Sequence, residues 1–163
     1  MNVLSEQYEL VKHTRELLFR FCETLDDADY TKELEGFGWG SVRNLHVHIA
    51  ECYQNWLGRF GMQENLTPVK PNQVRNVSDM REVFKQVDQL MHRFLDEYEG
   101  KYEAKLKGSV SWKEGDVELS VLWLFTHTLT HEFHHKGQMV TMGRQLGYTP
   151  TDTDMILPEE ISR

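Results

Sequence analysis

The chain has few cysteines, no long apolar run and no basic cluster, and each absence excludes a class of protein. Its two cysteines, Cys22 and Cys52, are too few for a disulfide framework and lack C-x-x-C spacing. The N-terminal segment, residues 1–21, mixes charged and apolar side chains, unlike a signal peptide or a transmembrane helix. We therefore expect a cytoplasmic protein.

Basic residues are also in the minority. Lysine and arginine total 18 against 26 aspartates and glutamates, which gives a formal net charge of −8. A surface of that sign repels phosphate backbones and anionic lipids, so we expect neither nucleic acid nor a membrane as partner. The length of 163 residues is that of a single domain, residues 1–163, with enough buried surface to fold alone.

Apolar residues recur at helical spacing in four segments. The first predicts a helix over residues 2–26. The second predicts a helix that is capped by Ser41 and reaches about Phe60. Residues 61–78 contain two prolines and show no period, which predicts a long connection.

The third segment predicts a helix that Ser78 or Asp79 caps and that ends near Gly100. Residues 101–115, which follow it, are ambiguous. They alternate weakly between apolar and polar side chains, and this pattern is compatible with a short hairpin or with a plain loop.

The fourth segment is the most apolar of the set. It opens at Asp116 or Ser120 and runs to about Gly147, and residues 149–163 follow as a tail over the surface. Four helices of these lengths favour a four-helix bundle, with the long connection joining helices two and three. The predicted fold class is therefore all-α.

Four of the eight histidines lie within nine positions in the segment from Thr126 to Gln138. His127, His131 and His135 are four residues apart, so they form a row on one face of the fourth helix. Such an i, i+4 pair can place two imidazole nitrogens about 2 Å from one divalent ion. Two ligands from one helix hold a metal poorly, so a third donor is needed.

One source of that donor is suggested by the letters H-E-x-x-H, which begin at His131 and match a zinc-protease motif. In that arrangement Glu132 would be the general base, and Glu159 or Glu160 would be the third ligand. Such motifs usually follow a sheet lobe that forms the substrate cleft. Helices are predicted upstream here, so this arrangement is the less favoured one.

The favoured third donor is His48. It lies on the apolar stripe of the second helix, three residues after Leu45 and four before Cys52, and would face the histidine pair inside the bundle. His46 is turned away from that stripe by about 200° and is expected to be solvated.

The two motifs that contain these histidines are "SVRNLHVHIAE" and, about 80 residues later, "HEFHHKGQ". Together they resemble the DinB family, and the resemblance covers nearly the whole chain. It implies a four-helix bundle whose metal ligands are His48, His131 and His135. It also implies a divalent ion, commonly zinc or nickel, a homodimer, and chemistry of low-molecular-weight thiols, as in thiol S-transferases and a thiol-dependent isomerase.

Several neighbouring side chains are candidates for a role in the site. Asn44, one turn before His48, could bind substrate or serve the first turn of its helix. Glu132 could act as a general base or orient a ligand, although a carboxylate at that offset is more often on the surface. His127 could extend the polar face, but a core histidine is the more common case.

Other candidates are expected to be structural. Cys52 is expected to be a small buried residue. Four aromatic residues are expected mostly in the core, and one of them, Trp56, is a candidate to line a pocket; they are Trp39, Trp56, Trp123 and Phe125. His134 and Gln138 form a further i, i+4 pair that could bond to a neighbouring helix.

Three neutral imidazoles would leave an ion its positive charge and at least one open position. The favoured hypothesis is a thiol S-transferase, in which a metal-activated thiolate attacks a small electrophile. The alternatives are a hydrolase that uses metal-bound water and a non-catalytic metal-binding protein. Structural sites normally have four protein ligands, so three histidines favour catalysis on a small-molecule substrate.

Overall fold

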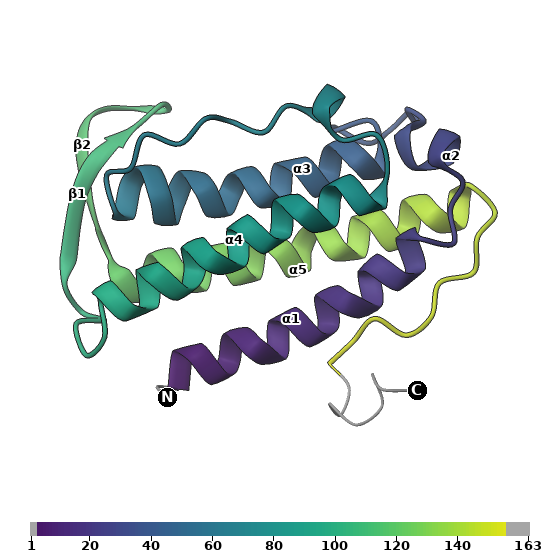
Figure 1. The fold of residues 1–163 in the computed structure, drawn as a ribbon. Helices are drawn as coiled ribbons and strands as arrows, with labels where there is room; N and C mark the ends of the chain where they lie inside the picture. Colours follow the sequence, from purple (N-terminus) through teal and green to yellow (C-terminus); the bar gives the residue numbers. More distant parts are fainter. Residues whose placement is uncertain (1–2, 156–163) are drawn as a thin grey trace.

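A computed structural model describes residues 3–155 as a mostly helical chain with a small two-stranded sheet (Figure 1). The long helices are α1 (Val3–Cys22), α3 (Val42–Tyr53), α4 (Val77–Glu97) and α5 (Val121–Gln145). The shorter ones are α2 (Asp27–Thr31) and the 3-10 turn η2 (Pro71–Gln73). A π-helical segment, η1 (Gln54–Gly61), continues α3 without a break.

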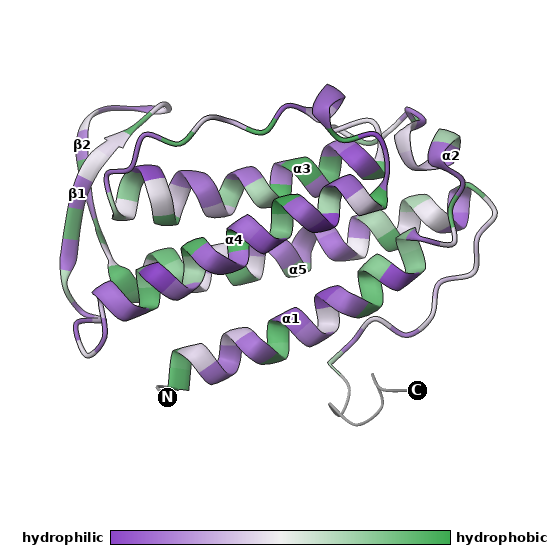
Figure 2. Cartoon of the chain, in the orientation of Figure 1, coloured by the Kyte–Doolittle hydropathy of each residue, from purple (hydrophilic) through white to green (hydrophobic). Residues whose placement is uncertain are grey.

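The four long helices lie side by side around an apolar core (Figure 1). α3 packs against α4 and α5, and α1 contacts the same two helices. Hydrophobic and hydrophilic residues alternate along each long helix, so each can turn an apolar face inward (Figure 2). Each helix contributes a fully buried aromatic ring to this core: Tyr8, Tyr53, Phe94 and Phe125.

The predicted long connection is present as residues 62–76, between η1 and α4. It runs back along α3, so α3 and α4 point in the same direction (Figure 1). Glu51 on α3 anchors the connection, because its carboxylate accepts hydrogen bonds from the Val69 amide at 2.6 Å and from Arg59 at 3.2 Å. Arg59 also donates to the Leu66 carbonyl at 3.1 Å.

The all-α prediction is wrong for residues 105–120, which form an antiparallel hairpin. β1 (Lys105–Val110) pairs with β2 (Lys113–Ser120), and Gly108 lies opposite Val117. The hairpin packs closely on η1, where a Cβ atom at Gly108 would lie 2.8 Å from the Phe60 ring. Because no residue of either strand is fully buried, the apolar alternation in the sequence was too weak to separate a hairpin from a loop.

Two predicted helix caps are confirmed. The Ser41 hydroxyl accepts a hydrogen bond from the Asn44 amide at 3.1 Å, and the Ser120 hydroxyl accepts one from the Trp123 amide at 3.1 Å. Each interaction satisfies an amide of the first helical turn that has no partner within the helix. Asp116, the alternative start of the last helix, lies in β2.

Two other helix boundaries differ from the prediction. α1 ends at Cys22 rather than at residue 26. The cap of α4 is Asn76, not Ser78 or Asp79, because Asn76 has the extended backbone that a cap requires. Its side chain accepts a hydrogen bond from the Asp79 amide at 3.0 Å.

The short helix α2 was not predicted, and it changes the environment of His46. Tyr30 of α2 is buried, and its hydroxyl lies 3.0 Å from His46 Nδ1. Phe19 of α1 stacks on the same imidazole, with ring centroids 5.1 Å apart. His46 is therefore fully buried, and the prediction that it is solvated was wrong. Burial lowers the pKa of His46 to about 3.

No helix among residues 3–155 combines the length and apolarity needed to cross a membrane. Residues 148–155 follow α5 without regular structure and are largely exposed, as predicted for a surface tail. Lys136 of α5 donates to the Thr153 carbonyl and holds this part of the tail. The remainder of the predicted tail, residues 156–163, lies outside the described residues.

Candidate metal centre

Three imidazoles from two helices converge at one point. His131 Nε2 on α5 lies 3.0 Å from His48 Nε2 on α3 and 3.2 Å from His135 Nε2 on the next turn of α5. One ring nitrogen from each of the three histidines lies within 4.8 Å of the others. The sequence prediction that these three side chains meet is confirmed.

The spacing of these nitrogens is compatible with a divalent ion. Around an ion with metal–nitrogen bonds of about 2.0–2.1 Å, tetrahedral ligand nitrogens lie roughly 3.3 Å apart. The two short distances observed are close to that value. His131 Nε2 has two close nitrogen neighbours, His48 Nε2 and His135 Nε2. An imidazole nitrogen carries either one proton or one lone pair, so it can form only one good hydrogen bond. A cation that all three nitrogens bind therefore suits this arrangement better than hydrogen bonds among them.

Gln138 determines which nitrogen of His135 is free to bind an ion. Its Oε1 lies 2.7 Å from His135 Nδ1 and only accepts, so Nδ1 carries the proton and Nε2 offers its lone pair. Gln138 also lies 3.4 Å from His134, on the same helix. His134 and Gln138 therefore make contacts within α5, instead of the expected hydrogen bond to a neighbouring helix. The contact from Gln138 to His135 orients a candidate ligand.

Trp39, from the loop before α3, stacks on His48 with ring centroids 3.8 Å apart and an angle of 22° between the rings. Asn44 holds that loop, because its Nδ2 donates to the Trp39 carbonyl at 2.9 Å. Its Oδ1 accepts a hydrogen bond from Arg43 at 2.8 Å. Trp39 is 46% exposed, so the expectation of a core residue was wrong here.

The three imidazoles lie in surroundings that favour their neutral form. Burial, and then the neighbouring His135, lowers the pKa of His48 to about 4. Burial, and then the surrounding imidazoles, lowers the pKa of His131 to about 3. Burial also lowers the pKa of His135. A neutral imidazole is the form that binds a metal ion, so no deprotonation is needed near pH 7.

Glu132 is buried, so the expectation of a surface carboxylate was wrong. Arg15 of α1 donates to both carboxylate oxygens, at 2.7 and 2.9 Å, and the Tyr53 hydroxyl donates to Oε2 at 2.5 Å. Position 132 therefore faces α1 and α3, because α5 packs against both helices. These bonds engage the carboxylate that the zinc-protease arrangement would use as a general base.

The Arg15–Glu132 pair belongs to a network that joins four helices. Arg15 also donates to Asp88 of α4 at 2.6 Å, and the Tyr8 hydroxyl donates to the same Asp88 oxygen at 2.6 Å. Burial raises the pKa of Tyr8 and of Tyr53, so both phenols remain neutral donors. The candidate ligand helix α5 is thereby bonded to α1 and α3, and α1 in turn is bonded to α4.

A cavity of about 580 Å³ lies beside His48 and His131, and its walls include Cys52, Trp56 and His127. Cys52 and Trp56 are buried, in agreement with their predictions. Burial raises the pKa of Cys52 to about 12, so its thiol stays protonated. His127 is half-buried in the cavity wall rather than in the core.

Sequence reasoning missed Arg15, although a signal for it was present. Arg15 lies four residues after Val11 and three before Leu18, both of which are buried on the apolar stripe of α1. The same offsets identified His48 on the second helix. The alternative third ligands, Glu159 and Glu160, lie outside the described residues.

The fold and the site together define a mostly helical protein with a three-histidine group that could hold a divalent ion. The model of the DinB family matches residues 1–162. The chain therefore belongs to the DinB family, as its two histidine motifs suggested. No match to a curated protein was found.

Proposed function

We propose that this protein is a metal-dependent enzyme that transfers a low-molecular-weight thiol to a small electrophile. His48, His131 and His135 would hold one divalent ion, either zinc or nickel. The observation that supports this most strongly is the convergence of three ring nitrogens beside an open cavity. Three protein donors leave a bound ion at least one free position, whereas closed structural sites normally have four.

The residues of the chain would prepare the site for this reaction. Gln138 keeps His135 Nε2 unprotonated, and Trp39 restricts the rotation of the His48 ring. A bound divalent ion would supply a lowered pKa for an incoming thiol and hence a thiolate near neutral pH. In the transfer, sulfur bonds to the electrophilic carbon, the leaving group departs with its electron pair, and the thiol proton passes to solvent.

We also infer a single four-helix-bundle domain, a cytoplasmic location, small-molecule partners and a homodimer, as the family resemblance and composition suggest. The assembly is measured by size-exclusion chromatography with light scattering. A chain that remains monomeric at every concentration would contradict the homodimer.

Metal binding is tested by elemental analysis of the purified chain. We expect stoichiometric zinc or nickel in the wild type and none in His48→Ala. His92→Ala, which removes an exposed histidine of α4, serves as the matched control and should keep the metal. Glu159→Gln/Glu160→Gln should also keep it. Loss of metal in that double variant, with retention in His48→Ala, would restore the zinc-protease arrangement.

Catalysis is tested with the metal-loaded chain, a panel of cellular thiols and a chromogenic electrophile. We expect a thiol-dependent rate that falls to background in His48→Ala. Stoichiometric metal without a rate for any thiol would identify a non-catalytic metal-binding protein. Ester hydrolysis in the absence of thiol would instead favour a hydrolase.

A further inference from the structure

Aromatic rings from three separate elements line the cavity beside the histidines. Trp56 comes from η1, Trp112 from the turn between β1 and β2, and Trp123 and His127 from the start of α5. The cavity volume of about 580 Å³ lies within the usual range of small-molecule pockets, roughly 300–1,000 Å³. His48 also lines the cavity, so an occupant would lie next to the three-histidine group.

The rings hold one another in defined orientations. Trp56 is 6% exposed, and the centroids of Trp112 and Trp123 lie 5.8 and 5.1 Å from its own. Both contacts are edge-to-face, at 63° and 71°, an arrangement that aromatic pairs prefer. His127 stacks on Trp123 with an angle of 5° between the rings. The cavity is therefore largely formed before any ligand binds.

Two of these tryptophans remain in contact with water. Trp112 is 70% exposed and Trp123 is 40% exposed. Clustered, exposed apolar rings are unfavourable in water and mark surfaces that bind a partner or ligand. A flat apolar ligand would cover these rings and would gain the aromatic contacts that they offer.

The charged side chains of the cavity are already paired. Glu51 accepts hydrogen bonds from Arg59 and from the Val69 amide, and Arg59 also donates to the Leu66 carbonyl. Among the described residues that line the cavity, no unpaired carboxylate is left to attract a cation. Glu51 and Arg59 neutralise each other, so these two side chains offer no net charge to an ionic ligand. Burying a charge without a partner is costly, so these surroundings favour an uncharged ligand.

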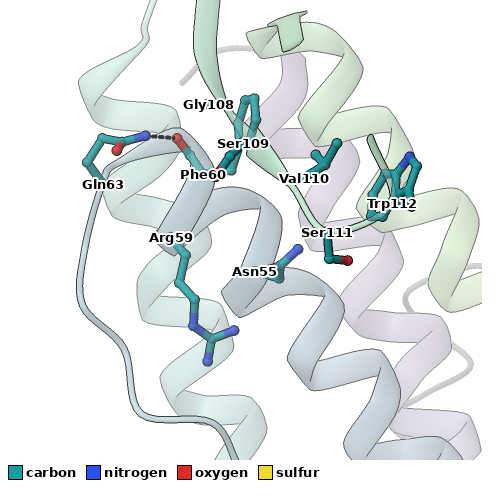
Figure 3. Close-up of a pocket in the computed structure, with 9 residues that line it drawn as sticks. All are labelled: Asn55, Arg59, Phe60, Gln63, Gly108, Ser109, Val110, Ser111 and Trp112. Atoms are coloured by element: carbon teal, nitrogen blue, oxygen red, sulfur yellow. Dashed lines mark hydrogen bonds between the residues drawn. The ribbon is translucent and has the colours of Figure 1, made fainter. Parts of the chain in front are cut away.

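A second cavity of about 240 Å³ continues from the first and shares Asn55, Arg59 and Trp112 with it. Figure 3 shows the hairpin residues Ser109 and Ser111 and the η1 residue Asn55 around this space. Their hydroxyl and amide groups make it more polar than the aromatic cavity. It leaves room for a polar substituent at the end of the ligand away from the histidines.

We propose that the aromatic cavity binds an uncharged, planar aromatic compound, whose ring packs among Trp56, Trp112 and Trp123. The inference rests on the proposed function in one respect, since it takes this compound to be the electrophile that the thiol attacks. Its reactive group would then lie beside His48, and its polar substituent would lie near Asn55 and Ser111.

Binding is tested by isothermal titration calorimetry of the full chain with naphthylmethanol, in the absence of thiol. We expect saturable binding that weakens at least about tenfold in Trp123→Ala and in Trp112→Ala, because each change removes an aromatic contact. Leu10→Ala is the control. It removes an exposed apolar side chain of α1 that lies outside the cavity, and it should leave the affinity within about twofold.

Two further probes test the chemistry of the ligand. Decahydronaphthylmethanol, which is apolar but not planar, should bind at least about tenfold more weakly, and so should naphthylmethyl trimethylammonium. Equal binding of the saturated probe, tighter binding of the cation, or no binding of naphthylmethanol would each overturn the proposal. Because no thiol is present, a failed thiol-transfer assay leaves this result unaffected, and the two proposals can fail separately.

Discussion

Neighbouring residues of α5 lie in different surroundings because each step turns the helix by about 100°. His131 faces His48 and the cavity, whereas Glu132 faces Arg15 in the interior. His135 then returns to the site one turn later, where the Gln138 amide oxygen holds its Nδ1 proton. Just over two turns of α5, residues 131–138, thus supply two candidate ligands, the carboxylate of a buried ion pair and the group that orients one ligand.

Gln138→Leu should weaken metal binding without unfolding the chain. The change removes the acceptor for His135 Nδ1, so the imidazole loses its fixed tautomer and orientation. We expect the dissociation constant to rise roughly 10- to 100-fold, as measured by titration against a competing chelator. Gln86→Leu, at an exposed glutamine of α4, is the matched control. Equal metal affinity in both variants would show that Gln138 does not orient the ligand.

At the scale of elements, the Arg15–Glu132 pair fixes α1 against α5 and is linked to α3 and α4 through Tyr53 and Asp88. Arg15 and Glu132 are each 3% exposed, so neither side chain can find water as a substitute partner. Removal of one partner from such a pair leaves a buried charge without full compensation. The network therefore makes the position of the ligand helix depend directly on α1 and α3, and on α4 through Arg15.

Glu132→Gln should lower the free energy of unfolding by about 3–5 kcal/mol, because it leaves the buried Arg15 guanidinium undercompensated. Urea denaturation measures the change. The double variant Arg15→Met/Glu132→Gln should recover part of the loss, since it removes the unpaired charge as well. Glu82→Gln, in an exposed ion pair with Lys85, should cost less than about 1 kcal/mol. A similar small loss in Glu132→Gln would contradict the network's role.

The features that could be predicted from sequence are those that depend on neighbours within a few residues. The apolar stripes and the spacing of His131 and His135 are of this kind, and the stripe also identified His48. The environment of Glu132 could not be predicted in this way, because its partner Arg15 is 117 residues away. His46 was misjudged for a similar reason, since Tyr30 covers it from a short helix with too few residues to show a period.

For the molecule as a whole, helices and irregular segments contribute differently to the site. α3 and α5 supply the three histidines from the interior of the fold. The loop before α3 supplies Trp39, which packs on His48, and the turn between the two strands supplies Trp112 to the cavity. The histidine geometry thus depends on the packed helices, whereas the cavity also depends on segments outside them.

Alkaline pH should destabilise the whole fold through its buried tyrosines. Burial raises the pKa of Tyr8, Tyr30 and Tyr53 above the ordinary value of about 10. These phenols stay neutral in the folded state but ionise in the unfolded chain. Their contribution to the free energy of unfolding is therefore complete below about pH 10 and is lost as pH rises toward the folded-state pKa. Each tyrosine loses about 1.4 kcal/mol of this contribution per pH unit.

Urea denaturation at several pH values between about 8 and 11 measures this loss. Buried Cys22 and Cys52 contribute to it from about pH 8.5, because burial also raises the pKa of each thiol. Tyr30→Phe and Tyr53→Phe isolate the tyrosine contribution. Each variant should start less stable, since it loses a hydrogen bond to His46 or Glu132, but should lose less stability above about pH 10. An identical decline in the wild type and both variants would show that the phenols ionise equally in the folded and unfolded states.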